Sequence, residues 1–591
     1  MIFGKHINKF YKKYFWHFFF GVVALLVVDY VQLLVPEEIG NIVNGFQNGD
    51  ITSLNNPQLV KSLITILVVA ATMFIGRFTW RRCIFGEAIR IQAELRNEMF
   101  IKTEALSQRF YKENKTGAIL AYFSNDLETL EETFSYGIIQ LIDGFFLGFI
   151  AIIKMFRLNV IITLFSLIPL VILGLCAVFI DKAMEKRYAK RQKAFESMSD
   201  FSQENFSGIR VIKAFVKEKK ELSQFAKENQ KNKDTNIAFV KFDAILNVLI
   251  QFLIYTVIAI ILCLGSYFAY LHSIGEAIKF QAGDLITFMG YFDHIIWPVF
   301  AVAQVINLTA RGKTSYSRIA SLLDEKVEIN DNGAVIIPSE IKGGIKFNNF
   351  SFSYPDDPEV KVLENINFEI KPGETVGVIG KIGSGKSTLV NMLFRLYNVA
   401  PGSLYIDNYD IMELPLRVVR DSIGYAPQDN FLFSDTIEKN IKFANDQIDD
   451  IEVSGAAEFS AVRENIENFQ DGYQTMIGER GVTLSGGQKQ RISISRAVVK
   501  DPAILVLDDS VSAVDIKTEE TILNNIKKQR KGKTTILIAS RVSTVEKLDK
   551  VLVLKEGKVE YFGTNKECKL HSPTYKRMVE LQTLENELEG E

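Results

Sequence analysis

A glycine-rich run near residue 380 has the composition and spacing of a phosphate-binding loop. Residues 380–388 read GKIGSGKST and match the pattern G-x-x-x-x-G-K-[ST]. The run follows the apolar segment ETVGVIG and precedes TLVNMLFRLY, so we expect it to join a strand to the start of a helix. Backbone N–H groups of such a loop bind phosphate oxygens, and we expect Lys386 to reach the β- and γ-phosphates and Ser387 to bind Mg²⁺. The nucleotide-binding candidates are Gly380, Gly383, Ser384, Gly385, Lys386, Ser387 and Thr388.

A second set of candidates lies at the end of an apolar segment further along the chain. Residues 504–509 read ILVLDD, so Asp508 and Asp509 follow four apolar residues. A carboxylate at the tip of a buried strand is placed to hold Mg²⁺ through water. We therefore expect Asp508 to be a metal ligand beside Ser387, with Asp509 as the next residue.

The elements that position these residues follow an alternating pattern from residue 343 onward. Short β-rich runs alternate with helical stretches, which is the pattern of an α/β domain. The β-rich runs are IKFNNFSFSY, VLENINFEI, ETVGVIG, AILVLDD, TTILIAS and KVLVLKEGKVEYFG. We expect residues 343–591 to form a nucleotide-binding domain, joined by a linker at 311–342 to a different domain at 1–310.

The first 310 residues are predicted to cross a membrane. A spanning helix needs about 20 mostly apolar residues, and six stretches are long and uniform enough. The predicted spans are Phe15–Leu34, Leu63–Trp80, Thr133–Phe156, Val160–Ile180, Ile245–Leu271 and Leu285–Leu308. The connections from the second span to the third and from the fourth to the fifth are long, charged and rich in helix formers, so we expect helical arms that continue out of the membrane.

Charge divides the chain in the same way. Residues 1–320 have a net charge of +8 and the remainder −10, which gives −2 overall. The basic residues gather before the first span and in the two long connections, which places both termini in the cytoplasm. A chain this close to neutral gives no argument for a nucleic-acid partner.

Several polar side chains fall inside the predicted spans, where they are costly unless they face a bundle interior or an aqueous cavity. Packing between helices and contact with a substrate are about equally good explanations for each of them. Asp143 and Asp293 are the candidates for binding a cationic solute.

The sequence resembles the ABC transporter ATPases at a third motif. Residues 484–488, LSGGQ, followed by KQR, are similar to the signature motif of that family. The resemblance implies that a helix begins here and faces the γ-phosphate of ATP held by the other nucleotide-binding domain of a dimer. The signature candidates are Ser485, Gly486, Gly487 and Gln488. Nearly the whole chain fits the arrangement of an ABC exporter half-transporter: a membrane α-helical bundle of six spans with long cytoplasmic extensions, fused to an α/β P-loop ABC ATPase domain.

Further positions match the family in order and spacing. Tyr354 stands where the family stacks an aromatic ring on adenine, and Gln428 resembles the Q-loop glutamine that touches Mg²⁺ and the attacking water. Residues 478–481, GERG, resemble the segment with which exporters touch their transmembrane arms. Residues 512–515, SAVD, resemble the D-loop, with Asp515 as its acid.

Two positions depart from the family's hydrolytic pattern. The family usually has a catalytic Glu where this sequence has Asp509, whose side chain is shorter by about 1.5 Å. A general base must lie about 2.6–3.2 Å from the water that it deprotonates, so this lost reach can prevent the contact. The family's switch His is replaced by Ser540. The catalytic candidates are therefore Asp509, Ser540 and Gln428, in a site that is expected to bind ATP and Mg²⁺ but to hydrolyse ATP poorly. Because the signature motif is intact, the simplest assembly is a heterodimer with a second half-transporter.

The resemblance implies an ATP-driven translocase in the cell membrane that exports drug-like or amphipathic molecules. Two alternatives remain open. One is a flippase for lipids or lipid-linked precursors, and the other is an ATP-gated regulator or sensor in which slow hydrolysis suits a switch.

Overall fold

The computed structural model describes residues 4–276, 279–478, 484–511 and 514–589. The chain divides into two compact units, which are described separately. The first comprises residues 1–103 and 117–324, and the second comprises residues 104–116 and 325–591. The domain boundaries expected from the sequence stay predictions; the last helix of the first unit runs on past residue 310 to Asp324.

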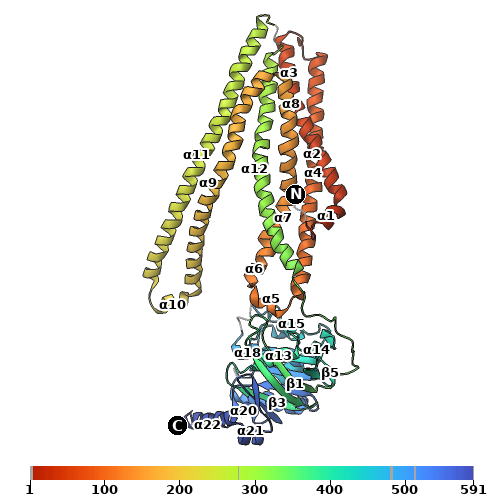
Figure 1. Ribbon diagram of the computed structural model, residues 1–591, viewed down its shortest axis with the longest axis vertical. Coiled ribbons are helices and arrows are strands. Elements are labelled where there is room, and N and C mark those ends of the chain that lie inside the picture. The colour runs from red at the N-terminus through yellow and green to blue at the C-terminus, as the bar shows by residue number, and fades with distance from the viewer. Residues whose placement is uncertain (1–3, 277–278, 479–483, 512–513, 590–591) are drawn as a thin grey trace. The chain divides into compact units, whose positions relative to one another are not determined.

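The first unit is entirely helical in its described residues, and it contains two π-helical turns, η1 and η2. In Figure 1 the long helices α9 and α11 run side by side and are joined by α10. The elements are α1 (Asn8–Lys13), α2 (Phe15–Gln32), α3 (Leu34–Gln47), α4 (Pro57–Ala105), α6 (Thr116–Ala121), η1 (Tyr122–Asp126), α7 (Leu127–Ile142), η2 (Asp143–Leu147), α8 (Gly148–Leu158), α9 (Val160–Ser207), α10 (Ile209–Ala214), α11 (Glu218–Ser273) and α12 (Ala282–Asp324).

Five stretches of the described residues are long and apolar enough to cross a membrane. They are Phe15–Gln47, Pro57–Ala105, Thr116–Leu158, Glu218–Ser273 and Ala282–Asp324. The predicted fourth span begins with the shorter apolar stretch Val160–Ile172 at the start of α9. The expected helical arms are present, because α4, α9 and α11 each continue for 48 to 56 residues, far beyond the 20 that a membrane requires.

Polar side chains join the helices inside the first unit. Gln140 on α7 donates through Nε2 to Oε1 of Gln304 on α12, at 2.5 Å. Asp126 in η1 is buried and accepts hydrogen bonds from Ser315 Oγ at 2.7 Å and from Arg318 Nε at 2.9 Å on α12. These bonds join helices through groups that would otherwise be costly in an apolar bundle, although Oε1 of Gln140 is buried and has no hydrogen-bond partner among the described residues.

The second unit is an α/β domain with two sheets. The six-stranded sheet has the order β10-β9-β3-β8-β7-β6, with β10 antiparallel and the other neighbours parallel, and the four-stranded antiparallel sheet has the order β2-β1-β4-β5. The strands are β1 (Ile345–Phe352), β2 (Leu363–Ile370), β3 (Thr375–Gly380), β4 (Leu404–Ile406), β5 (Tyr409–Asp410), β6 (Ile423–Ala426), β7 (Ile504–Asp508), β8 (Thr534–Ile538), β9 (Lys550–Lys555) and β10 (Lys558–Gly563).

The parallel strands β7 and β8 are buried along their whole length, as their continuous apolar sequences predict. The helices of this unit are α5 (Gln108–Glu113), α13 (Lys386–Leu393), α14 (Leu416–Ser422), α15 (Ile437–Lys442), α16 (Asp450–Phe459), α17 (Arg463–Glu467), the 3₁₀ turn η3 (Gly472–Gln474), α18 (Gly486–Val498), α19 (Ile516–Gln529), α20 (Val542–Val545), α21 (Asn565–His571) and α22 (Pro573–Glu589). Because β3, β8 and β7 pair in parallel, their carboxyl ends lie at one edge of the sheet.

Arg530, directly after α19, holds the opposite ends of β7 and β8 together. Its guanidinium donates to the carbonyl oxygens of Pro502 and Thr534, each at 3.0 Å, and to Oγ1 of Thr535 at 3.2 Å. The residue is 5% exposed, and burial lowers the pKa of Arg530 to about 10. Its hydrogen bonds satisfy buried carbonyl groups where the two strands begin.

We expect Arg530→Ala to destabilise the second unit by about 2–4 kcal/mol, because buried carbonyl groups lose their donors. That loss corresponds to a fall of roughly 5–10 °C in Tm for a unit of this size, measurable by scanning fluorimetry of the full-length chain. Arg417→Ala is the matched control, since the Arg417 side chain is 91% exposed and pairs only with Asp421 on the next turn. Equal Tm values for the two variants would contradict the role assigned to Arg530.

Candidate functional site

The phosphate-binding loop has the strand–loop–helix setting that the sequence predicts. The loop begins at Gly380, the last residue of β3, and leads into α13 at Lys386. Gly383 and Gly385 have φ values of 83° and 95°, a backbone region that residues with a Cβ atom rarely adopt. A Cβ on Gly380 would lie 2.2 Å from the carbonyl oxygen of Leu554, so only glycine fits there. The glycines are therefore required by the backbone path that turns N–H groups toward a bound anion.

The charged and hydroxyl groups at the start of α13 lie close to the tip of β7. Lys386 Nζ donates to the carbonyl oxygens of Gly380 at 2.8 Å and Lys381 at 3.2 Å. Ser387 Oγ lies 3.5 Å from Oδ1 of Asp508. Asp508 is 3% exposed, and burial is the main cause that raises its pKa, while burial lowers the pKa of Lys386. A hydroxyl and a carboxylate so close together form the hard oxygen donor set that suits Mg²⁺ with the rest of its shell supplied by phosphates and water.

The backbone at Asp509 is held in an unusual conformation. Its φ is 47°, in the left-handed region that Asp tolerates better than most residues. Its N–H donates to the carbonyl oxygen of Ile538 at 3.0 Å, and its carbonyl oxygen accepts from Nε2 of Gln490 at 3.1 Å. Both backbone bonds of Asp509 are therefore made to other elements, β8 and α18, and these bonds fix the direction in which its side chain leaves the chain.

Two further candidates follow neighbouring strands. Gln428 comes after β6 and Ser540 after β8, and each of these strands pairs with β7 in parallel. Their positions thus lie at the edge of the sheet that carries Asp508. Both side chains are exposed. Ser540 also lines a cavity of about 600 Å³ between α19, α20 and α22.

Tyr354 lies beside the phosphate-binding loop and is fixed by several neighbours. Its hydroxyl is 2.9 Å from Oγ1 of Thr388, and its ring meets the rings of Phe352 and Tyr397 edge-on. Lys112 of α5 places its ammonium 4.6 Å from the centre of the Tyr354 ring and 2.7 Å from Oδ2 of Asp356. The neighbour Lys112 was not found from the sequence, because no local signal links residues 242 positions apart.

The signature residues begin α18, as the resemblance implies. Ser485 is the N-cap of this helix: its Oγ accepts from the N–H of Gln488 at 3.3 Å, and Oε1 of Gln488 accepts from the N–H of Ser485 at 3.0 Å. Ser485 and Gly486 are exposed. The start of a 13-residue helix is therefore open to solvent and carries the partial positive charge that favours an anion.

Other candidates have simpler surroundings. Asp515 caps α19 by accepting from the N–H of Thr518 at 3.0 Å and from its Oγ1 at 2.7 Å, and the side-chain bond is the main cause that lowers the pKa of Asp515.

In the first unit, Oδ2 of Asp143 accepts from Nε1 of Trp297 at 3.0 Å, whereas Asp293 is exposed. Residues 479–481, 512 and 513 lie outside the described residues, so the structure says nothing of those parts of the predicted motifs.

The sequence also missed Gln490, which ties the signature helix to Asp509. Gln490 is 3% exposed. A polar residue on the buried face of α18 is the signal that could have identified it, because a buried amide needs a partner.

Comparisons with known proteins agree with this geometry. Residues 18–299 match the family described as the ABC transporter transmembrane region, and residues 363–512 match the ABC transporter family. A probable multidrug resistance ABC transporter ATP-binding/permease protein of Bacillus subtilis, YheI, is 32% identical over 589 residues, which are 99% of this chain and 98% of the relative. The multidrug resistance-like ATP-binding protein MdlA of Escherichia coli is 32% identical over 97% of this chain and 96% of its own.

A solved structure extends the likeness to the fold. A bacterial Atm1-family ABC exporter with ATP bound superposes with a TM-score of 0.74 at 24% identity, covering 95% of this chain and 97% of that chain. The chain carries an exporter-type transmembrane domain and an ATPase domain in one polypeptide, which makes it a multi-pass membrane protein that binds ATP. It belongs to the ABC transporter family, as a half-transporter of the exporter type.

Proposed function

We propose that this chain is the weakly hydrolytic subunit of a heterodimeric exporter that moves drug-like or amphipathic molecules out of the cell. The observation that carries the proposal is the fixed backbone of Asp509. Because its N–H and carbonyl are bonded to Ile538 and Gln490, the backbone cannot advance to compensate for the methylene that Asp lacks relative to Glu. A base held short of the attacking water abstracts its proton slowly.

The second departure acts in the same direction. The family has His at the position after β8, where this chain has Ser540. The serine hydroxyl lies closer to the backbone than the ring nitrogens of a histidine, so it reaches less far toward the γ-phosphate. The groups proposed to bind nucleotide, by contrast, match the family pattern: the loop glycines, Lys386, and Tyr354, which would stack on adenine. Ser387, Asp508 and Gln428 would hold Mg²⁺, whose chemistry is to neutralise charge on the phosphates. The site is thus suited to retain ATP and slow to cleave it.

The intact signature helix argues for a partner. The exposed start of α18, capped by Ser485, could donate N–H groups to the phosphate of an ATP molecule that is bound by another subunit's phosphate-binding loop. In the proposed dimer, α18 completes a site on the second half-transporter, which brings its own Glu and His. The arms near residues 115–117 and 207–208 would transmit closure of the ATPase domains to the spans, with both termini in the cytoplasm. Export of drugs is supported by the two relatives reported above, both of which are named for multidrug resistance.

The first test repairs the site. The purified wild-type chain alone should hydrolyse ATP slowly, and the double variant Asp509→Glu/Ser540→His should raise kcat about 100-fold, the lower end of what general acid–base catalysis contributes. The Kd for ATP should change little, because the loop is untouched. Asp421→Glu, on the exposed surface, is the control. Rapid turnover by the wild-type homodimer, abolished by Asp509→Asn, would refute the proposal.

A second test concerns the signature helix. In the co-purified heterodimer, Ser485→Ala in this chain should reduce ATPase activity at least tenfold although this chain's own phosphate-binding loop is intact. Removing an N-cap also costs about 1 kcal/mol of helix stability. Thr564→Ala is the matched control, because Thr564 caps α21 with the same reciprocal bonds to Glu567. Equal activity in the two variants would show that α18 does not serve a catalytic site.

A third test addresses the substrate. ATP-driven uptake of a dye into inverted vesicles distinguishes a pump from a sensor, which would show no uptake. Asp143→Asn removes the charge but keeps an acceptor for Nε1 of Trp297, so the helix contact survives. We expect this variant to lower uptake of a cationic dye about tenfold and to leave a neutral dye unaffected. Equal loss for both dyes would assign Asp143 to packing alone.

A further inference from the structure

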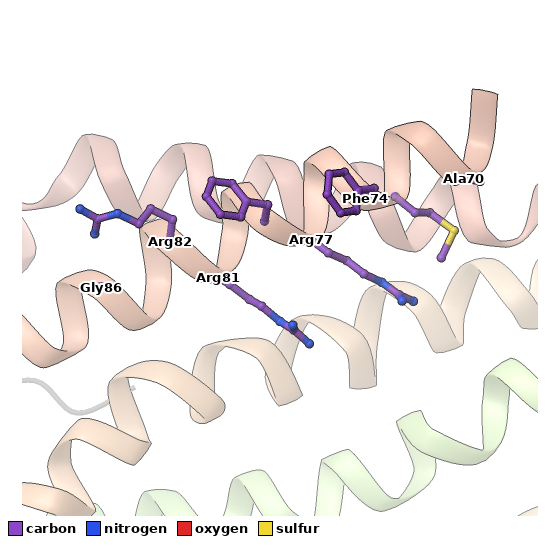
Figure 2. Close-up of a pocket in the computed structure, with 8 residues that line it drawn as sticks. Ala70, Phe74, Arg77, Arg81, Arg82 and Gly86 are labelled. Atoms are coloured by element: carbon purple, nitrogen blue, oxygen red, sulfur yellow. The ribbon is translucent and has the colours of Figure 1, made fainter. Parts of the chain in front are cut away.

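Basic side chains on α4 and on the following helix α5 have different surroundings. Figure 2 shows Arg77 and Arg81 of α4 extending in the same direction beside a cavity of about 790 Å³, and the described residues do not show what covers that face of α4. The basic side chains of α5, by contrast, contact the nucleotide-binding domain. Because α5 belongs to the second unit together with residues 325–591, these contacts lie within one unit.

The first of these contacts anchors the start of α5 to the segment that follows α12. Arg109 places a guanidinium nitrogen 2.8 Å from Oε1 of Glu328, and Ser107 donates through Oγ to Oε2 of the same carboxylate at 3.0 Å. The carbonyl oxygen of Glu328 in turn accepts from Nδ2 of Asn398 at 2.9 Å. These bonds fix one end of the short helix, so the position of Lys112 near its other end is also set.

The second contact joins Lys112 to the half-buried ring of Tyr354. The Lys112 ammonium lies 4.6 Å from the centre of this ring and 2.7 Å from Oδ2 of Asp356, two residues further along the same loop. On its other sides the ring meets two aromatic neighbours edge-on, and its hydroxyl is 2.9 Å from Oγ1 of Thr388 in α13. One ammonium group therefore holds both the ring and the loop that carries it, and the ring is oriented toward the helix that follows the phosphate-binding loop.

We propose that Lys112 is a positioning residue for nucleotide binding: it orders the Tyr354 ring before ATP binds, and adenine then stacks on the ring face opposite to Lys112. A side chain that is already ordered costs less to immobilise when a ligand binds, so the affinity rises. A cation over one face also offsets the negative charge of the ring's π system, which favours stacking of a base on the other face. The inference rests on the stacking role proposed for Tyr354, and it is independent of how fast this chain hydrolyses ATP.

The experiment compares two ligands that differ in whether they carry a base. Equilibrium binding of ATP and of inorganic tripolyphosphate is measured on the purified full-length chain without Mg²⁺, so that no hydrolysis occurs. Tyr354→Leu should raise the Kd for ATP about tenfold, as expected for the loss of one base-stacking contact. Lys112→Met, which keeps the length of the side chain, should raise it about threefold, the size expected for a cation–π contact at an exposed site. Neither variant should change the Kd for tripolyphosphate.

A matched control makes the same two kinds of contact elsewhere in the domain. Lys550 lies 5.1 Å from the centre of the Phe562 ring and 2.7 Å from Oε1 of Glu374. It pairs with Val376 near the start of β3, whereas the phosphate-binding loop leaves the other end of that strand. Lys550→Met should therefore leave the Kd for ATP unchanged, and Lys112→Arg should keep the wild-type Kd because a guanidinium also binds an aromatic face.

A double-mutant cycle shows whether Lys112 acts through the ring. In the Tyr354→Leu background, Lys112→Met should cause no further loss of ATP affinity, because the group that it positions is absent. A loss that also extends to tripolyphosphate would overturn the proposal by making Lys112 a general support of the domain. Tighter ATP binding by Lys112→Met would overturn it as well, since the ammonium would then occupy the face that the base needs.

The two levels of the hypothesis fail in different ways. An unchanged Kd for ATP in Tyr354→Leu would refute the stacking role in the proposed function, and this inference with it. A tenfold loss in Tyr354→Leu together with an unchanged Kd in Lys112→Met would refute the role of Lys112 alone.

Discussion

Parallel pairing of three buried strands determines where the chemistry of this chain lies. Ile538 of β8 pairs with Val378 of β3 on one side and with Asp508 of β7 on the other, so the carboxyl ends of all three strands meet at one edge of the sheet. The phosphate-binding loop leaves from β3, the carboxylate proposed to bind Mg²⁺ ends β7, and Ser540 follows β8. A slip of one residue in either pairing would turn Asp508 to the opposite face of the sheet and away from Ser387. Arg530 opposes such a slip, because its hydrogen bonds fix the other end of the same strands.

The membrane half depends on a different constraint, which is that buried polar groups need partners. Asp126 is satisfied by Ser315 and Arg318, and this pairing joins the turn before α7 to α12 without a ligand. Gln140 donates through Nε2 to Gln304, and Asp143 accepts from Trp297, but each keeps one buried side-chain oxygen that has no hydrogen-bond partner among the described residues. Gln140 and Gln304 also line a cavity of about 900 Å³. Helix packing and substrate contact are therefore equally good explanations for Gln140 and Asp143, as the sequence indicates.

Much of this arrangement could be predicted from sequence, because local patterns determine it. Glycine spacing identifies the loop, and apolar runs identify the buried strands and the spans. Two substituted residues are the basis for proposing a weak site. What could not be predicted depends on distant partners. No local pattern places Lys112 over Tyr354, gives Asp509 a positive φ, or bonds Gln490 to its carbonyl group. Asp515 is an example in which a motif assigns a role that the contacts do not display. The family resemblance makes it the acid of the D-loop, whereas its contacts in the structure are those of a helix cap.

The groups proposed to bind nucleotide lie beside those proposed to activate water, yet the two sets would act at different stages of the reaction. The loop glycines, Lys386 and Ser387 would act on phosphates that are present in both the ground state and the transition state, so they would govern affinity. Asp509 and Ser540 would act only as the attacking water loses its proton, and changes there would alter rate without altering affinity. In the proposed function a subunit could therefore lose hydrolytic power and still bind ATP. The bond from Gln490 to Asp509 joins the signature helix to the residue that is proposed to limit hydrolysis.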